Sequence, residues 1–273
     1  MAKATQEDKA LEQVTGKLAV PDYITGREGT EQIERQDVTY PRLGLCQSLT
    51  PQKKKSDANH IPNLTDGQFF NTITGEIYGE SVLVVPILFS KQRIKFHPMS
   101  EGGGIECQSF NGKDGGFLSP KCEELDGTTV CEHAKFSDNH RPTCDKLHNR
   151  PAAIVKPIDR PASGGIFFCE VADIPIIISL KSTGLKVSKQ WNSLVKLNPN
   201  TPMFARVYEL ISTEVTKGQQ SWFAPTIKPR GFVPPDLFRQ LKTAYDSLKD
   251  VNITADMTGM ETEEAPDETG AGF

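Results

Sequence analysis

The stretch SVLVVPILFSKQRIKFH, residues 81–97, decides the fold. Its first half is β-branched and apolar, which predicts a buried strand. In its second half the side chains alternate, because successive residues of a strand face opposite sides. One face carries an aromatic ring and three bases: Phe89, Lys91, Arg93 and Lys95. The other face turns Ile94 and Phe96 toward a core. Three bases on one face repel one another, so this strand is predicted to lie beneath a polyanion.

The segments around this strand have a mainly β, α+β character. Strands are predicted in residues 38–49 and 164–183, and a hairpin in 203–227 with its turn near Lys217. Apolar residues recur at helical spacing in GLKVSKQWNSLVKL and, more clearly, in PPDLFRQLKTAYDSLKD. Several short strands with glycine-rich turns predict an OB-like antiparallel barrel that carries an insertion and a C-terminal helix.

Composition divides the 273 residues into three parts. Residues 1–37 are polar, residues 38–249 are the predicted nucleic-acid-binding domain, and residues 250–273 form a disordered acidic tail. Within the domain, residues 101–150 form an insertion rich in Gly, Cys, His and Asp. The chain starts without the apolar stretch of a signal peptide, and its apolar runs are too short to span a bilayer. A cytoplasmic location with reduced cysteines and no membrane partner is therefore expected.

Charge is distributed unevenly along the chain. Residues 250–273 hold seven acids and no Lys or Arg, and removing them from the net charge of −4 leaves +3 for residues 1–249. A basic body with an acidic tail favours a nucleic-acid surface combined with an interaction tail. A tail that only improves solubility is the alternative.

Four cysteines fall in the insertion and predict a structural zinc site. They are Cys107, Cys122, Cys131 and Cys144. Zinc takes four thiolate or imidazole ligands, and it supplies folding energy that a segment poor in aliphatic residues lacks. His133 or His148 is an alternative ligand in place of one cysteine. Cys46 and Cys169 stand in apolar strands and are expected to be buried thiols.

Catalytic motifs are not evident, and we expect no enzymatic activity. The sequence contains no HExxH, P-loop, G-x-S-x-G or deaminase pattern. The segment FSDNHRPTCDKLHNRP has the residue types of a His-Asn-His metal nuclease, with His140 and His148 as candidates, but lacks the flanking strand-to-helix pattern.

The layout of the chain resembles that of bacterial single-stranded-DNA-binding proteins and their tailed-phage counterparts. Those proteins join a basic OB-fold body to an acidic tail that ends in an aromatic or apolar residue. The matching tail residues here are Glu261, Glu263, Glu264, Asp267, Glu268 and the terminal Phe273. The zinc segment resembles an insertion found in some phage members. The segments YPRLGLCQSLTPQ and GQFFNTITGEIYGESVLVVPI resemble phage proteins grouped with these binders.

The resemblance implies a phage single-stranded-DNA-binding protein that protects unpaired strands in replication and recombination. A cationic groove and stacking aromatics would hold the strand, and such a groove accepts DNA and RNA alike. The tail would compete for the groove and recruit replication or recombination proteins through Glu263, Glu264, Asp267, Glu268 and Phe273.

Candidate contact residues follow from charge and aromaticity. The phosphate contacts expected are Lys91, Arg93 and Lys95, then Lys186, Lys189, Lys228 and Arg230. The stacking residues expected are Phe89, Tyr208 and Trp222, whereas Trp191 and Phe96 are assigned to the core. Residues 53–55 form a basic loop able to close over a strand. Two other functions stay open: a zinc protein of the virion or of assembly, and a metal nuclease.

Overall fold

The computed structural model describes residues 37–97, 104–112 and 144–251, together with positions 29, 32, 33, 253 and 255–257. Its strands are β1 (Leu43–Leu45), β2 (Phe69–Asn71), β3 (Ile77–Gly79), β4 (Ser81–Pro86), β5 (Ser90–Phe96), β6 (Ile105–Ser109), β7 (Asp145–Pro157), β8 (Cys169–Leu180), β9 (Arg206–Lys217) and β10 (Gln220–Phe232). The α-helices are α3 (Gly184–Lys196) and α4 (Pro235–Leu248), and two 3₁₀ turns are η2 (Pro51–Lys53) and η5 (Met203–Ala205).

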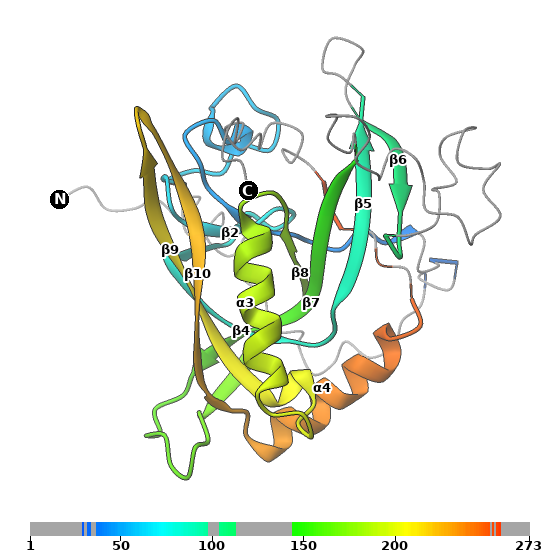
Figure 1. Cartoon of the computed structure of the whole chain (residues 1–273), viewed down its shortest axis with the longest axis vertical. Helices are drawn as coiled ribbons and strands as arrows, with labels where there is room; N and C mark the ends of the chain where they lie inside the picture. Colours follow the sequence, from blue (N-terminus) through cyan, green and yellow to red (C-terminus); the bar gives the residue numbers. More distant parts are fainter. Residues whose placement is uncertain are drawn as a thin grey trace, which may run out of the picture.

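A seven-stranded antiparallel sheet forms the body (Figure 1). Strand β7 is its axis, because β4 and β5 follow one another along one edge of β7 while β8 pairs with the other edge. Between β4 and β5 the Ile87 N–H donates to the Pro151 carbonyl at 2.7 Å, so the ladder continues across the junction. Strands β9 and β10 extend the sheet beyond β4, and β6 extends it beyond β5. Strands β1–β3 form a separate small sheet.

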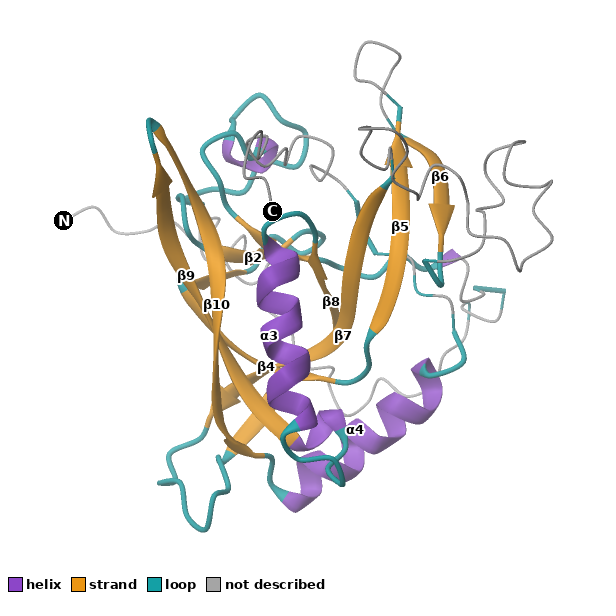
Figure 2. Ribbon diagram, in the orientation of Figure 1, coloured by secondary structure: helices purple, strands orange, loops and turns teal. Residues whose placement is uncertain are grey.

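Both faces of the sheet are buried, which explains the continuous apolar run in residues 82–88. Val82 and Val84 pack on the face that carries α3 and the small sheet, with Trp191 at 0% exposure. Val85 packs on the opposite face with the buried side of α4. We call these the inner face and the outer face of the sheet. Figure 2 shows α3 lying along the inner side, between the β9–β10 hairpin and the β5–β6–β7 strands.

Helix α4 confirms the helix predicted after Pro234. Proline stands in its first turn, where the missing N–H costs nothing, and Leu237, Leu241 and Leu248 are the buried residues of its apolar face. Helix α3 likewise buries Ser188 and Trp191 on its sheet-facing side.

The mainly antiparallel α+β class is confirmed, but the described strands close into no barrel. Helix α3 contacts both β8 and β10, two of the three edge strands of the described sheet, and so occupies the space between them. The segment before β8 meets the end of β10 through an isolated bridge between Ile166 and Phe232. The sequence shows strands and turns, but it does not show which strands are the sheet edges.

Two predicted boundaries shift in the structure. Strand β6 and the start of β7 lie within residues 101–150, yet both pair with β5 and belong to the main sheet. The acidic tail was expected from residue 250, but Ile253 and Ala255 are 8% and 2% exposed in the outer core. The Asp256 N–H also donates to the Tyr40 carbonyl at 2.8 Å. These contacts hold positions 253, 255 and 256 against the domain, although composition alone assigns them to the tail.

The free edge of β10 is met by a side chain. Gln47 Nε2 donates to the Phe223 carbonyl and the Phe223 N–H donates to Gln47 Oε1, each at 2.8 Å. The packing around this contact is close, because a Cβ on Gly67 would lie 2.8 Å from the Phe223 ring. Gly67 also has φ +81°, a conformation that glycine adopts without strain.

Candidate nucleic-acid interface

Strand pairing gathers cationic side chains on the inner face, beside α3. Lys91 lies opposite His148 and Arg93 lies opposite Lys146, so all four side chains share one face. Lys189 of α3 is close enough to act electrostatically on both Lys146 and His148. We call Lys91, Arg93, Lys146 and Lys189 the basic face. The predicted alternation in β5 is confirmed, since Ile94 is 1% exposed on the other side.

Among the described residues, few carboxylates lie against the basic face. Lys91, Lys146 and Lys189 form no ion pair with a carboxylate in residues 37–97, 104–112 and 144–251. Burial lowers the pKa of Lys146, and the charges of Lys91, Arg93 and Lys189 lower it further. Four cations that repel one another across a sheet and a helix create an anion-attracting surface.

His148 lies at the centre of these charges as a neutral ring. Burial lowers its pKa to about 4, and the charges of Lys146, Arg150 and Lys91 contribute. The ring is 4% exposed, and its Nδ1 lies 2.7 Å from Ser188 Oγ of α3. A buried histidine tied to a helix does not suit the catalytic role considered for a metal nuclease. The other nuclease candidate, His140, lies outside the described residues.

Arg150 of β7 connects the sheet to α3 and is buried next to the basic face. It is 0% exposed, and its Nη2 donates to the Ser188 carbonyl at 3.1 Å and to Asn192 Oδ1 at 2.6 Å. The guanidinium carbon lies 4.7 Å from the centre of the Phe89 ring and 4.8 Å from that of Trp191. Burial lowers the pKa of Arg150 to about 10, and the two rings offset part of the cost of the buried charge.

The other predicted phosphate contacts lie in different surroundings. Lys95 shares its side of β5 but pairs with Glu106 at 2.7 Å, and this hydrogen bond raises the pKa of Lys95. Lys186 is exposed on α3. Lys228 and Arg230 lie on the outer face, because Ile227 occupies the inner core, Lys228 lies opposite Glu209 and Arg230 pairs with Glu209. Lys228 and Arg230 therefore lie on the face of the sheet opposite the basic face.

The three predicted stacking rings have different surroundings. Phe89 is partly exposed beside the basic face, with its edge against His148 at 5.1 Å between ring centres. Tyr208 is 1% exposed and packs on Trp191 at 5.3 Å, so it is unavailable for stacking on a base. Trp222 is partly exposed and lines a pocket. The core assignments of Trp191 and Phe96 are confirmed.

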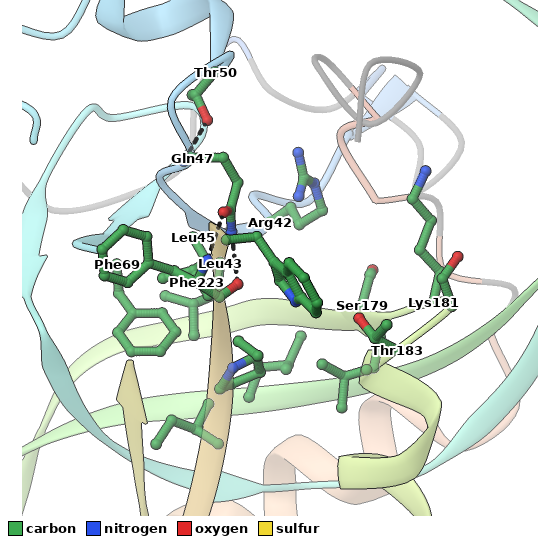
Figure 3. Close-up of a pocket in the computed structure, with 18 of the residues that line it drawn as sticks. Arg42, Leu43, Leu45, Gln47, Thr50, Phe69, Ser179, Lys181, Thr183 and Phe223 are labelled. Carbon is green, nitrogen blue, oxygen red and sulfur yellow. Dashed lines mark hydrogen bonds between the residues drawn. The ribbon is translucent and has the colours of Figure 1, made fainter. Parts of the chain in front are cut away.

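This pocket, of about 340 Å³, lies between β1, the N-terminal half of β10 and the start of α3. Figure 3 shows Leu43, Leu45 and Phe69 on one side of it and Ser179, Lys181 and Thr183 on the other. Trp222 is the one lining residue that was predicted as a contact residue, because the wall combines parts of β1, β2, β8, α3 and β10 that are far apart in the chain.

Two of the four predicted zinc ligands lie at the base of the insertion. Cys107 lies opposite Lys95, and Cys144 directly precedes Asp145, which lies opposite Ile94. Both thiols therefore flank Lys95, and both act on its charge. The two described cysteines of the predicted site therefore lie near each other, where the chain enters and leaves the insertion. Cys122 and Cys131 lie outside the described residues, among which no group of three or more potential ligands occurs.

Cys46 and Cys169 are buried, as expected, and burial raises the pKa of each thiol to about 11. Lys53 of the predicted basic loop pairs with Asp66 at 2.8 Å, while Lys54 and Lys55 are exposed. The tail residues Glu261 to Phe273 lie outside the described residues. Among the helices that are described, none is both long and apolar enough to span a bilayer.

Comparison with known proteins gives one match. A family model described as "Pam3 phage gp34-like protein" matches residues 12–254. Neither a curated protein nor a solved structure matches the chain.

His148 should make the fold sensitive to acid. Because its pKa falls from 6.5 to about 4 on folding, the unfolded chain binds the proton more tightly, and stability is lost as pH falls from 6.5 toward 4. The loss should approach about 3 kcal/mol. Urea unfolding at pH 7, 6, 5 and 4 measures it, and His148→Asn, which keeps a polar atom near Ser188, should flatten the slope. Identical slopes in both proteins would contradict the assignment.

The predicted zinc site also has a direct test. Elemental analysis of purified protein should find about one zinc per chain, lost in Cys107→Ala and in Cys144→Ala because each removes a ligand. Cys169→Ala is the matched control, since that thiol lies in the outer core, and it should keep the metal. If the wild-type protein is folded but contains no metal, the prediction of a structural zinc site is wrong.

Proposed function

The chain belongs to the Pam3 phage gp34-like protein family, and from this premise we propose that it binds single-stranded DNA during phage DNA metabolism. The basic face is the observation that carries the proposal. Its cations are drawn from β5, β7 and α3, three elements that other contacts hold rigidly together. Such a surface attracts polyanions.

The proposed mode of binding is sequence-independent. The backbone of an unpaired strand crosses β5, β7 and α3, with phosphates at Lys91, Lys146 and Lys189. Arg93, whose Nε donates to the Gly112 carbonyl at 3.3 Å, would contact a further phosphate through its Nη nitrogens. Phe89, partly exposed beside these cations, supplies a ring on which a base stacks. Neither contact depends on which base is present.

The insertion and the tail complete the proposal. Zinc held by Cys107, Cys122, Cys131 and Cys144 would stabilise the insertion that leaves the sheet beside Lys95. The acidic residues Glu263, Glu264, Asp267 and Glu268, with Phe273, would compete with DNA for the basic face and recruit replication or recombination proteins. Two positions that were expected in the tail, Ala255 and Asp256, pack against Tyr40 instead, so the competing segment starts after Met257.

Removal of the basic face should weaken DNA binding selectively. The triple variant Lys91→Ala, Lys146→Ala, Lys189→Ala should bind a fluorescent oligo(dT) roughly 100-fold more weakly at 0.1 M salt. The slope of log affinity against log salt should fall in magnitude by about 2, because each lost phosphate contact removes about 0.7. Fluorescence anisotropy at four salt concentrations measures both quantities.

The matched control removes the same charge from the other side of the sheet. Lys228→Ala, Arg239→Ala and Lys242→Ala lie on β10 and on α4, all exposed. This variant should bind like the wild type. Equal losses in the two triple variants would reduce the effect to net charge, and equal wild-type affinity for duplex and single strand would contradict the proposal.

Truncation after Met257 tests the tail. Removing residues 258–273 should tighten binding to oligo(dT) several-fold at low salt, with the difference fading at high salt because the competition is electrostatic. The melting temperature should not change, since the packed residues 253–257 remain. Weaker binding by the truncated protein would refute the competition.

A further inference from the structure

Helix α3 carries positive charge and no negative charge. Its residues Gly184–Lys196 include Lys186, Lys189 and Lys196 but neither Asp nor Glu. All three lysines are exposed, and none of them forms an ion pair with a carboxylate in the part of the chain that the structure describes. An acid three or four residues away on the same helix would neutralise such a lysine, as it does in α4. Helix α3 therefore presents a positive surface on its exposed side.

Two of these lysines form a row on the side of α3 next to β7. Asn192 marks that side, because its Oδ1 accepts a hydrogen bond from Arg150 of β7 at 2.6 Å. A helix turns by about 100° per residue, so Lys189 and Lys196 lie within about 60° of Asn192, whereas Lys186 lies about 120° from it. Lys189 and Lys196 are separated by about 10 Å along the helix axis. We call these two residues the α3 row.

Helix α3 and β7 advance in the same direction, side by side (Figure 1). His148 of β7 lies 2.7 Å from Ser188, and Arg150, two residues later, also donates to Asn192, one turn further along α3. Strand β5 is antiparallel to β7, so its residues occur in the reverse order beside α3. The end of α3, with Lys196, therefore lies beyond the start of β5.

The ring of Phe89 has a cation on either side along this direction. It is partly exposed and lies 4.7 Å from the guanidinium carbon of Arg150, level with the middle of α3. Lys91 follows two residues later on the same face, toward the start of α3. Lys196 lies on the opposite side, one turn past Asn192. A base stacked on Phe89 would thus have a cation near the phosphates on both of its sides.

We propose that the bound strand leaves the basic face along the α3 row. One phosphate lies at Lys91, a base stacks on Phe89, and a further phosphate lies at Lys196. This inference rests on the proposed function, and it adds Lys196 and a direction to the binding site. Two observations identify the occupant. The row is continuous with the basic face through Lys189, and its positive charge complements a phosphate backbone.

Single lysine variants of the full-length protein give the first test. Lys196→Ala should weaken binding of a fluorescent oligo(dT) roughly 5-fold at 0.1 M salt and lower the magnitude of the salt slope by about 0.7. Lys186→Ala is the matched control, because it removes the same charge from the same helix at a position turned away from the row. It should bind like the wild type. Equal losses in the two variants would reduce the effect to the charge of the helix and overturn the proposed path.

The length of the strand gives the second test. An oligo(dT) of about 4 nucleotides should occupy the basic face alone, whereas one of about 12 nucleotides should also reach Lys196. Lys196→Ala should therefore bind the shorter molecule like the wild type and lose affinity for the longer one. Lys91→Ala, within the basic face, should lose affinity for both. A loss in Lys196→Ala that is equal at both lengths would contradict a position at the end of the path.

The outcomes separate this inference from the function on which it rests. If the triple basic-face variant loses binding while Lys196→Ala binds like the wild type at both lengths, DNA binding stands and the path along α3 is wrong. If the wild type binds no single strand, both are wrong.

Two other results would give Lys196 a different role. A lower melting temperature of Lys196→Ala with unchanged affinity would assign this lysine to stabilising the last turn of α3, where a cation interacts favourably with the helix dipole. Binding of a peptide of residues 258–273 that depends on Lys196, with unchanged binding of oligo(dT), would assign the row to the acidic tail. Either result overturns the inference.

Discussion

The arrangement of the inner face depends on the sandwich of Arg150 between Phe89 and Trp191. This buried guanidinium holds α3 on β7 through Ser188 and Asn192, at distances of 3.1 and 2.6 Å. Because α3 is fixed there, Lys189 lies beside Lys146 and Lys91 rather than apart in solvent. A buried cation beneath a cationic surface is costly, and the apolar packing on both faces of the sheet offsets that cost. The position of the basic face is thus set by core packing, whereas its charge opposes stability.

Much of the fold could be predicted from the sequence, and the failures have a common cause. Periodicity identified the buried strand at 82–88, the alternating strand at 90–96 and the helix at 235–248, because each signal is local. The barrel was wrong because closure depends on which strands are edges, a property of pairing across the whole chain. Composition also separated residues 101–150 from the sheet, although strand pairing with β5 incorporates both of its ends.

The candidate site was predictable in part. Alternation in β5 predicts the shared face of Lys91 and Arg93. Lys146, His148 and Arg150 alternate in the same way in DKLHNRP, but the composition of residues 101–150 assigns that segment to the insertion. The position of Lys228 and Arg230 could not be predicted. Their register against β9 places them on the outer face, and register cannot be inferred from one strand alone. The burial of Tyr208 could not be predicted, because no sequence feature distinguishes a core aromatic from a surface aromatic in a strand. The pocket at Trp222 could not be predicted, because the elements that line it are far apart in the chain.

Gln47 caps part of the edge of the sheet at β10. Its amide occupies both hydrogen-bonding groups of Phe223, so at this point β10 offers no free backbone to a neighbouring molecule. Exposed strand edges can pair with the sheet of another molecule. A side chain that occupies both backbone groups at this point of β10 therefore opposes edge-to-edge association between copies of the chain.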